Sequence, residues 1–436
     1  MNPASRQTLN KRPWGWIPSV YIAEGLPYFA VNILTIIMYT NMGISKDVMA
    51  FYTGALYLPW VIKPFWSPFI DIFKTKRWWT LTMQLSICIT MIVVAFLINL
   101  GEFFYPTLIV FWIMAFCSAT HDIAADGYYM MALDDKSQAA FVGVRSTFYR
   151  IASVLGQGGI VIIAGLLETK YQNVPYAWSI TFTILSIIFL VIFLWDLWIM
   201  PKPKKDKPLS DLNSKLIVKN FFDTFVSFFQ KKHVWIAVVF MLLYRLPEAF
   251  CLKLVSPFLL DPAVEGGLAL STTEVGIANG TVGVICLLCG GIVGGLAIAM
   301  GGLKRWIWPM ALSLTLPCII YCLFAFYQPD YILICIGIGV EQFGYGFGFT
   351  AYMMYLMYFS AGESQTSHYA FCTAFMALGM MLPGMAAGWI FNICDMISVN
   401  LGIPFSSYMI FFGFVMLSCL CTFLAVSLLK PTLKDK

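Results

Sequence analysis

We single out ten ionisable side chains within long apolar stretches of this sequence as the residues best placed to do chemistry. Five are acids and five are bases, so their formal charges cancel. They are Glu24, Lys63, Asp122, Asp126, Arg145, Arg150, Arg245, Glu248, Lys253 and Glu341. A charge in an apolar medium is costly, so such residues usually have a function. The balance of signs suggests that they pair.

Four of these residues lie at matching heights on two consecutive predicted helices. With a rise of about 1.5 Å per residue, Asp122 and Arg150 lie about 6 Å and 5 Å from the centres of their helices, toward the same side. Asp126 and Arg145 each lie about 12 Å from the centre on that side. We therefore predict the ion pairs Asp122–Arg150 and Asp126–Arg145. Such pairs either serve the function directly or only hold the two helices together.

Three of the cations are candidates to bind an anionic group. Arg245 and Glu248 lie three residues apart near the centre of one apolar stretch, and Pro247 between them weakens the helix. Lys253 follows on the same helix, and Lys63 is central in another stretch. An Arg side chain binds a carboxylate or phosphate with two parallel hydrogen bonds. We expect Arg245, Lys253 and Lys63 to contact such a group.

Two acids, Glu24 and Glu341, have no partner at the same height on a neighbouring predicted helix. A carboxyl group in a low-dielectric cavity can hold a proton at neutral pH. Glu24 and Glu341 are therefore the first candidates for proton coupling, followed by Asp122, and Asp126 and Glu248 complete the set of acids. The alternative is a neutral, hydrogen-bonded carboxyl group with no such role.

Aromatic residues make up 17% of the chain, and several lie beside these charges. The candidate ligand contacts among them are Tyr28, Trp60, Tyr129 and Tyr345. An aromatic face next to polar groups suits a sugar ring or an acyl-peptide surface. The sequence contains no metal-ligand spacing, no hydrolase triad and no phosphate-binding loop. We expect no enzymatic activity, no metal and no cofactor.

The composition predicts the elements that position these residues. Only 11% of the 436 residues are charged, against about 25% in ordinary soluble proteins, and 60% are apolar. These values exclude a soluble enzyme, a nucleic-acid binder and a disordered protein. Stretches of roughly 20 apolar residues can span a bilayer as helices. Twelve occur, at 16–41, 50–72, 78–100, 105–132, 140–167, 176–200, 234–260, 274–300, 304–327, 331–359, 366–392 and 405–429. We predict an all-α integral membrane protein.

A polar segment, 201–233, separates six predicted spans from six more. We predict an N-terminal six-helix bundle over 1–200, a cytoplasmic linker, and a C-terminal six-helix bundle over 234–436. The phenylalanines of the linker fit a short amphipathic helix at the membrane surface, or the segment is only a linker. Lys and Arg gather in alternate loops, 20 on one side against Lys46 and Lys170 on the other. The positive-inside rule then places both termini in the cytoplasm.

The two halves repeat each other in places. Residues 71–78 and 299–306 each carry Lys-Arg-Trp in the loop after a predicted span. Two six-helix halves joined by a cytoplasmic loop resemble a major facilitator superfamily transporter, in which the substrate lies near the membrane midplane between the halves. Asp71 followed by Lys76 and Arg77 resembles the cytoplasmic loop motif of that superfamily, which implies a role in conformational change.

Four segments together resemble the AmpG muropeptide permeases, in the peptide–acetyl-coenzyme A transporter branch of this superfamily. They are Glu24-Gly25-Leu26-Pro27, then Leu58-Pro59-Trp60 with Lys63-Pro64-Phe65-Trp66-Ser67-Pro68, then His121-Asp122-Ile123-Ala124-Ala125-Asp126 with Tyr149-Arg150, and Leu243-Tyr244-Arg245 with Glu248. The resemblance covers most of the chain. It implies a 12-helix inner-membrane importer that uses the proton gradient and alternating access to take up N-acetylglucosaminyl-anhydro-N-acetylmuramic acid, with or without its peptide, in peptidoglycan recycling.

Departures from the family pattern leave the substrate open. Some family members carry two extra spans between the halves, and Asp126 is followed here by Gly127-Tyr128 in place of the usual neighbours. The alternatives are an importer of another oligosaccharide or of a small organic anion, with acetyl-coenzyme A ranked lower. A membrane sensor or transferase is a different class, and the sequence offers no soluble output domain or donor-binding loop for it. The expected partners are the substrate, protons and the bilayer, and we expect a monomer.

Overall fold

The computed structural model describes residues 13–203, 206, 219, 222–362, 365–401 and 405–429. This part of the chain is helical and contains no strand. Ten of its helices are long and apolar enough to cross a membrane. The predicted all-α membrane protein is therefore confirmed. Residues 1–12 and 430–436 lie outside the described residues, so the cytoplasmic position of the termini stays a prediction.

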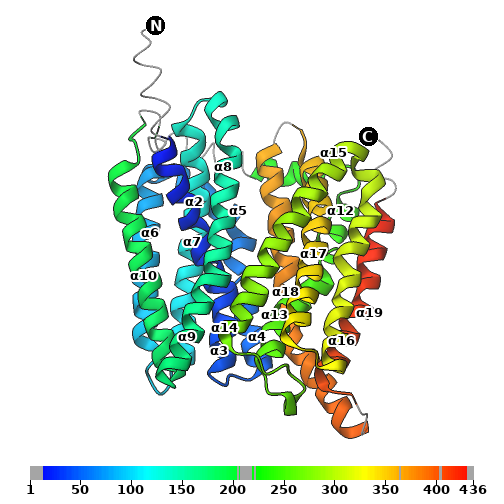
Figure 1. The fold of residues 1–436 in the computed structure, drawn as a ribbon. Helices are drawn as coiled ribbons and strands as arrows, with labels where there is room; N and C mark the ends of the chain where they lie inside the picture. The colour runs from blue at the N-terminus through cyan, green and yellow to red at the C-terminus, as the bar shows by residue number, and fades with distance from the viewer. Residues whose placement is uncertain are drawn as a thin grey trace. The chain divides into compact units, whose positions relative to one another are not determined.

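The first half of the chain forms a series of long helices (Figure 1). In chain order they are α2 (Pro13–Phe29), η1 (Ala30–Leu34), α3 (Thr35–Asn41), α4 (Lys46–Ala55), α5 (Leu58–Ile72), α6 (Lys76–Leu97), α7 (Phe104–Ala132), α8 (Asp135–Val154), η2 (Leu155–Ile160), α9 (Val161–Tyr171) and α10 (Val174–Ile199). Segments η1 and η2 are π-helical turns that continue the helices on either side of them. Two of the ten spans therefore run without a break, over Pro13–Asn41 and Gly143–Tyr171.

The second half begins after the linker. Its helices are α12 (Val234–Leu243), α13 (Leu246–Leu260), η3 (Ala263–Glu265), α14 (Thr272–Val275), η4 (Gly276–Gly283), α15 (Val284–Thr315), η5 (Leu316–Cys318), α16 (Ile319–Tyr327), α17 (Tyr331–Ser360), α18 (Gln365–Leu401) and α19 (Ser407–Leu428). Within the linker, residues 222–229 are helical. Phe228 on this helix is buried against Phe371 and the ring of His368, whereas Phe222 is exposed. The helix therefore has one packed and one open face, and its position at the membrane surface stays a prediction.

Two places explain why ten long helices are found where twelve spans were predicted. The predicted span 50–72 is divided between α4 and α5, which have 10 and 15 residues. The predicted spans 274–300 and 304–327 fall in one continuous segment of 56 residues, Thr272–Tyr327. Gly302 interrupts that segment with a φ of 72°, which an L-residue with a side chain rarely adopts. Twelve crossings stay a prediction.

Contacts between residues group the chain into two compact units. Unit 1 comprises Met1–Leu34 and Ile62–Phe221, and unit 2 comprises Thr35–Val61 and Phe222–Lys436. The division into bundles at 1–200 and 234–436 stays a prediction. The grouping by contacts differs from it because residues 35–61 belong to unit 2. That segment, with α3 and α4, packs on α13 and α18 of unit 2.

Glycines permit this close packing of α4 on α18. A Cβ atom added at Gly388 would lie 2.3 Å from the Cα of Asp47, and one added at Gly54 would lie 2.8 Å from the backbone N of Met385. Small residues that let two helix backbones approach in this way are typical of membrane helix pairs. The glycines therefore fix α4 as part of unit 2.

Candidate functional site

The charged centre of unit 1 contains two ion pairs. Arg145 on α8 lies 2.9 Å from Asp126 on α7, as the matching heights predicted. The Tyr21 hydroxyl donates to the same carboxylate at 3.1 Å, and the Arg145 guanidinium lies 4.8 Å from the centre of the Tyr21 ring. Asp122 pairs with Lys63 on α5 at 3.4 Å. Lys63 thus serves a carboxylate of unit 1, and its predicted contact with a ligand stays a prediction.

The predicted pair Asp122–Arg150 is wrong, because Lys63 takes the place of Arg150. Arg150 is exposed, and no ion pair of Arg150 occurs among the described residues. The position of a residue along its helix predicts its depth in the membrane, but not the direction in which its side chain points around the helix axis. Five residues turn an α-helix by about 140° beyond a full turn, so Arg145 and Arg150 cannot present the same face. Asp122 and Asp126, four residues apart, do share a face.

Glu24 lies on α2, in the same unit. Its Oε2 atom is buried and has no hydrogen-bond partner among the described residues. Tyr28 lies one turn further along the helix and is half-buried. Tyr129, by contrast, is 4% exposed and belongs to an aromatic core with Trp16 and Tyr21. The structure thus places Tyr129 in the packing of the unit, where a ligand does not reach it without rearrangement.

The charged centre of unit 2 begins at the break between α12 and α13. Arg245 occupies this break with φ −103° and ψ 14°, and Pro247 lies in the first turn of α13, where a missing N–H group costs nothing. Arg245 donates to both carboxylate oxygens of Glu248, at 2.8 Å and 2.6 Å, and to the Tyr345 hydroxyl at 2.9 Å. Its guanidinium also lies 4.8 Å from the centre of the Phe349 ring. This cation is therefore neutralised by its neighbour three residues away.

Lys253 lies two turns further along α13 and differs from Arg245 in its surroundings. It is 1% exposed, donates to the Thr53 hydroxyl at 3.2 Å, and lies 5.5 Å from the centre of the Tyr57 ring. No carboxylate pairs with it in the part of the chain that the structure describes. An ammonium group has three donors, so Lys253 retains donors for an anion. Trp60, also predicted as a contact, lies beyond Tyr57 on α5 and is half-buried.

Glu341 on α17 is a buried carboxyl group without a cation. It is 6% exposed and accepts hydrogen bonds from the Tyr321 hydroxyl at 3.1 Å and the Gln342 amide at 2.8 Å. No ion pair involves it within the described ranges. Glu24 and Glu341 are thus alike in having no ion pair among the described residues. Their role in proton coupling stays a prediction.

The sequence reasoning missed Asp196, which lies inside an apolar stretch and so met the criterion used for the other ten. It is fully buried on α10. The Ser19 hydroxyl donates to it at 2.5 Å and the Gln84 amide at 2.8 Å. The same amide nitrogen lies 3.3 Å from Nε2 of His121. Asp196 thus joins Glu24 and Glu341 as a buried acid without a cation among the described residues.

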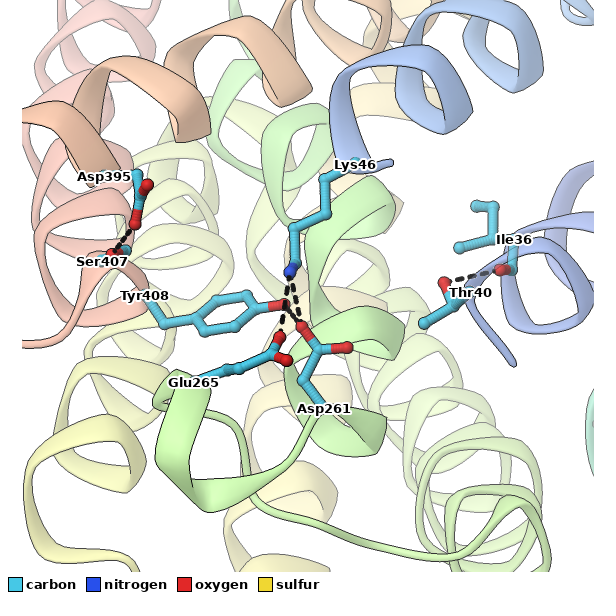
Figure 2. Close-up of polar contacts among 8 residues, drawn as sticks. All are labelled: Ile36, Thr40, Lys46, Asp261, Glu265, Asp395, Ser407 and Tyr408. Carbon is cyan, nitrogen blue, oxygen red and sulfur yellow. Dashed lines mark hydrogen bonds and ion pairs between the residues drawn. The ribbon is translucent and has the colours of Figure 1, made fainter. Parts of the chain in front are cut away.

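A second missed cluster lies at the start of α4 (Figure 2). Lys46 contacts Asp261 at 2.6 Å and Glu265 at 3.9 Å, and the Tyr408 hydroxyl donates to Asp261 at 2.7 Å. The Lys46 ammonium also lies 5.0 Å from the centre of the Phe391 ring. The partners lie more than 200 positions away in the chain, so no spacing rule could pair them. The cluster ties α4 to the end of α13 and to α19.

The predicted conformational loop shows helix-end contacts at two of its residues. The side chain of Asp71 lies outside the described residues. Lys76 and Arg77 donate their backbone N–H groups to the carboxylate of Asp206, at 2.6 Å and 3.0 Å. The Arg77 side chain donates to the carbonyl oxygens of Leu197 and Met200, at 2.7 Å and 3.1 Å. The loop therefore joins the start of α6 to the end of α10.

A family model supplies the decisive comparison, because the model of the Major Facilitator Superfamily matches residues 19–250, more than half of the chain. The chain belongs to the Major Facilitator Superfamily. Solved transporters agree in fold. A bacterial homolog of the human lysosomal transporter Spinster has a TM-score of 0.74 at 14% identity and covers 100% of this chain, with 99% of its own length matched. A D-xylose–proton symporter has a TM-score of 0.69 at 12% identity, covering 93% of this chain and 95% of its own.

Relatives by sequence narrow the branch. The anhydromuropeptide permease of Escherichia coli K12 is 23% identical over 374 residues, covering 84% of this chain and 72% of the relative. A Rickettsia conorii protein that carries an AmpG name is 22% identical over 382 residues, covering 85% of this chain and 88% of the relative. The resemblance to AmpG permeases is therefore confirmed. The protein is a multi-pass transporter of the bacterial inner membrane that carries a small molecule.

Proposed function

We propose that this protein imports muropeptides or anhydro-muramyl disaccharides together with protons, by alternating access. The observation that carries the proposal is Lys253, a buried amino group in unit 2 that has no carboxylate partner among the described residues. An arriving carboxylate would favour the charged form of this group. Muramic acid carries a carboxylate and the stem peptide carries more, so the substrate can supply the missing charge. The relatives named as anhydromuropeptide permeases support this class of substrate.

Lys253 is a better anion site than Arg245. The two hydrogen bonds from Arg245 to Glu248 satisfy both charges, and a substrate carboxylate would have to displace Glu248. Truncating one partner of such a buried pair is strongly destabilising because it leaves the other charge uncompensated. At Lys253 an anion would replace contacts with a hydroxyl group and an aromatic ring, and it would break no ion pair among the described residues. We assign Lys253 to the substrate carboxylate and Arg245, with Tyr345, to holding the break between α12 and α13.

Proton coupling is assigned to Glu24 and Glu341. Adding a proton to an ion-paired carboxylate breaks the pair, whereas these two acids have no ion pair to lose. A buried carboxylate without a cation is costly when charged, so the two acids favour the protonated form while they are shielded from water. A change of exposure during the transport cycle would release the proton.

Access to Lys253 is assigned to the segment with α3 and α4. Thr53 and Tyr57 cover the ammonium group, so an anion reaches it only after α4 leaves α13. The cluster of Lys46, Asp261 and Tyr408 holds α4 in the closed position. Opening this cluster would expose Lys253 to substrate, and closing it would shut the site again.

The test is uptake of labelled anhydro-disaccharide, with and without peptide, into vesicles that contain the full chain. Uptake that rises with an imposed inward proton gradient and is inhibited by unlabelled muropeptide supports the proposal. Uptake of a neutral oligosaccharide in place of the carboxylated sugar would mean that the protein is an oligosaccharide importer. If none of these compounds is taken up with a gradient imposed, the proposed function is wrong.

A further inference from the structure

A groove in unit 1 lies at the level of the Lys76-Arg77 loop, apart from the buried charges described above. It has a volume of about 420 Å³ and is formed by the start of α6, the end of α10 and the first residues after α10. Binding sites for small molecules typically have volumes of about 300–1,000 Å³. The groove therefore has room for a ligand, and the chemistry of its two ends indicates which one.

One end of the groove is cationic. Arg77 uses its Nε and one Nη atom for carbonyl oxygens of α10, which leaves other N–H donors of its five unoccupied by any contact among the described residues. Lys202 is exposed and makes no hydrogen bond or ion pair with the described residues. Asp206 is the acid of the lining, but it is buried and its two oxygens already accept the N–H groups at the start of α6. The charges that remain open to a ligand are positive.

The other part of the groove is apolar. It is lined by Leu81, Leu85, Phe193 and Leu197, and the exposed fractions of Leu85 and Leu197 are 39% and 46%. Trp78, which is 43% exposed, lies near the cationic end. Tryptophan is enriched where a membrane protein crosses from hydrocarbon to head groups. A cationic end, an interfacial Trp and an apolar lining follow one another as the phosphate, glycerol and acyl chains do in a phospholipid.

We propose that this groove binds one anionic phospholipid, with its phosphate at Arg77 and Lys202 and an acyl chain along Leu81, Leu85 and Leu197. We choose an anionic lipid because its charge complements Arg77 and Lys202. A zwitterionic head group would bring its own cation next to these two basic side chains. The bound lipid would also hold the end of α10 and Asp206 in place. The proposal does not depend on the substrate or on proton coupling.

The chain supplies a matched control for this site. The second half repeats the loop as Lys304-Arg305-Trp306, with both basic residues exposed. Substituting Lys304, which matches Lys76 in the repeat, removes one exposed positive charge from the second half without touching the groove. Lys202 is the better test residue than Arg77, since Lys202 makes no contact that a substitution would break, whereas Arg77 binds the end of α10.

The experiment measures binding of phosphatidylglycerol to the purified full chain by native mass spectrometry, with the thermal unfolding midpoint as a second readout. We expect Lys202→Gln to weaken the tightest phosphatidylglycerol site by about fivefold, because one basic residue near the surface contributes about that factor to anionic-lipid binding. Lys304→Gln should leave this site unchanged, and phosphatidylcholine should not occupy it. We expect Arg77→Gln with Lys202→Gln to remove the site.

Three results would overturn the proposal. Equal losses in Lys202→Gln and Lys304→Gln would mean that only the general positive charge attracts the lipid. Equal retention of phosphatidylcholine would exclude selection by the phosphate charge. If glycerol phosphate alone raised the thermal unfolding midpoint as much as phosphatidylglycerol does, the groove would be a site for a free phosphate group and not for a lipid. Lys202→Gln is expected to fold, because its side chain is exposed, so a change in lipid retention can be measured.

Discussion

The charged centres of the two units differ in which charge is left without a partner. Unit 1 pairs Lys63 with Asp122 and Arg145 with Asp126, and two of its acids, Glu24 and Asp196, have no ion pair among the described residues.

Unit 2 pairs Arg245 with Glu248 and leaves a base as well as an acid. Lys253 and Glu341 each have hydrogen-bond partners, but neither has a partner of opposite charge among the described residues. The equal numbers of acids and bases among the ten residues chosen from the sequence therefore do not reveal which charges lack a partner. An unpaired acid suits a proton, and an unpaired base suits an anionic substrate.

The largest expected effect comes from removing the unpaired base. Lys253→Gln keeps a donor for Thr53 but removes the charge, so uptake of muropeptide at low substrate concentration should fall by about 30-fold or more. Lys253→Arg should retain part of the uptake, because the positive charge is kept. Vesicle uptake measures both, and Lys170→Gln, an exposed Lys in unit 1, is the control. If uptake is unchanged in Lys253→Gln, the unpaired base of unit 2 does not bind the substrate, and the proposed difference between the units is wrong.

The unpaired acids should give the next largest effect. Each coupled proton allows a gradient of one pH unit to drive accumulation of at most about tenfold. Uptake should rise as the outside becomes more acidic, since protons then enter with the substrate. Glu341→Gln or Glu24→Gln should abolish this dependence and leave exchange of labelled for unlabelled substrate. If a variant still accumulates substrate with the wild-type pH dependence, the substituted residue does not carry the coupled proton.

A substitution in the cluster at Lys46 tests how Lys253 becomes accessible. Asp261→Asn keeps the hydrogen bond from Tyr408 but removes the ion pair with Lys46, which is partly exposed. A pair of this kind contributes roughly 1 kcal/mol, so the open state of α4 should become about fivefold more populated. Reaction of Lys253 with a membrane-impermeant amine reagent, followed by peptide mass spectrometry, measures the change. Glu102→Gln, an exposed acid of unit 1, should leave the labelling rate unaltered.

Asp196 gives the smallest expected effect and sharpens the comparison within unit 1. Asp196→Asn keeps the size of the side chain and an acceptor for Ser19, so a neutral hydrogen-bonding role predicts uptake within about twofold of wild type. The pH dependence of uptake should also be kept. Loss of that dependence, with the unfolding midpoint unchanged, would instead give Asp196 the coupling role assigned to Glu24.

Part of this arrangement could be predicted from the sequence. Apolar stretches predicted the membrane helices, Pro247 predicted the break before α13, and equal heights on consecutive helices predicted Asp126–Arg145. These predictions depend on local periodicity or on neighbours along the chain. Asp196 was also within reach, since it is an acid in an apolar stretch.

The remaining features depend on contacts that local patterns do not encode. The pairing of Lys63 with Asp122 requires the rotation of α5, which Pro64 and Pro68 obscure. The position of α4 within unit 2 depends on glycines of α18, far along the chain. The same packing decides that Lys253 is covered by Thr53 and Tyr57. Height along a helix predicts depth, and only tertiary packing decides which side chains meet.

The most direct test of the account is a binding cycle that changes the charge of Lys253 and of the substrate separately. Isothermal titration would measure the dissociation constants of anhydro-muramyl disaccharide and of its carboxyl-amide analogue, for the wild type and for Lys253→Gln. The account predicts that the wild type binds the carboxylate about 30-fold more tightly than Lys253→Gln does, while the amide binds both proteins with similar affinity. An equal loss of affinity for both ligands in Lys253→Gln would contradict the assignment of Lys253 to the substrate carboxylate.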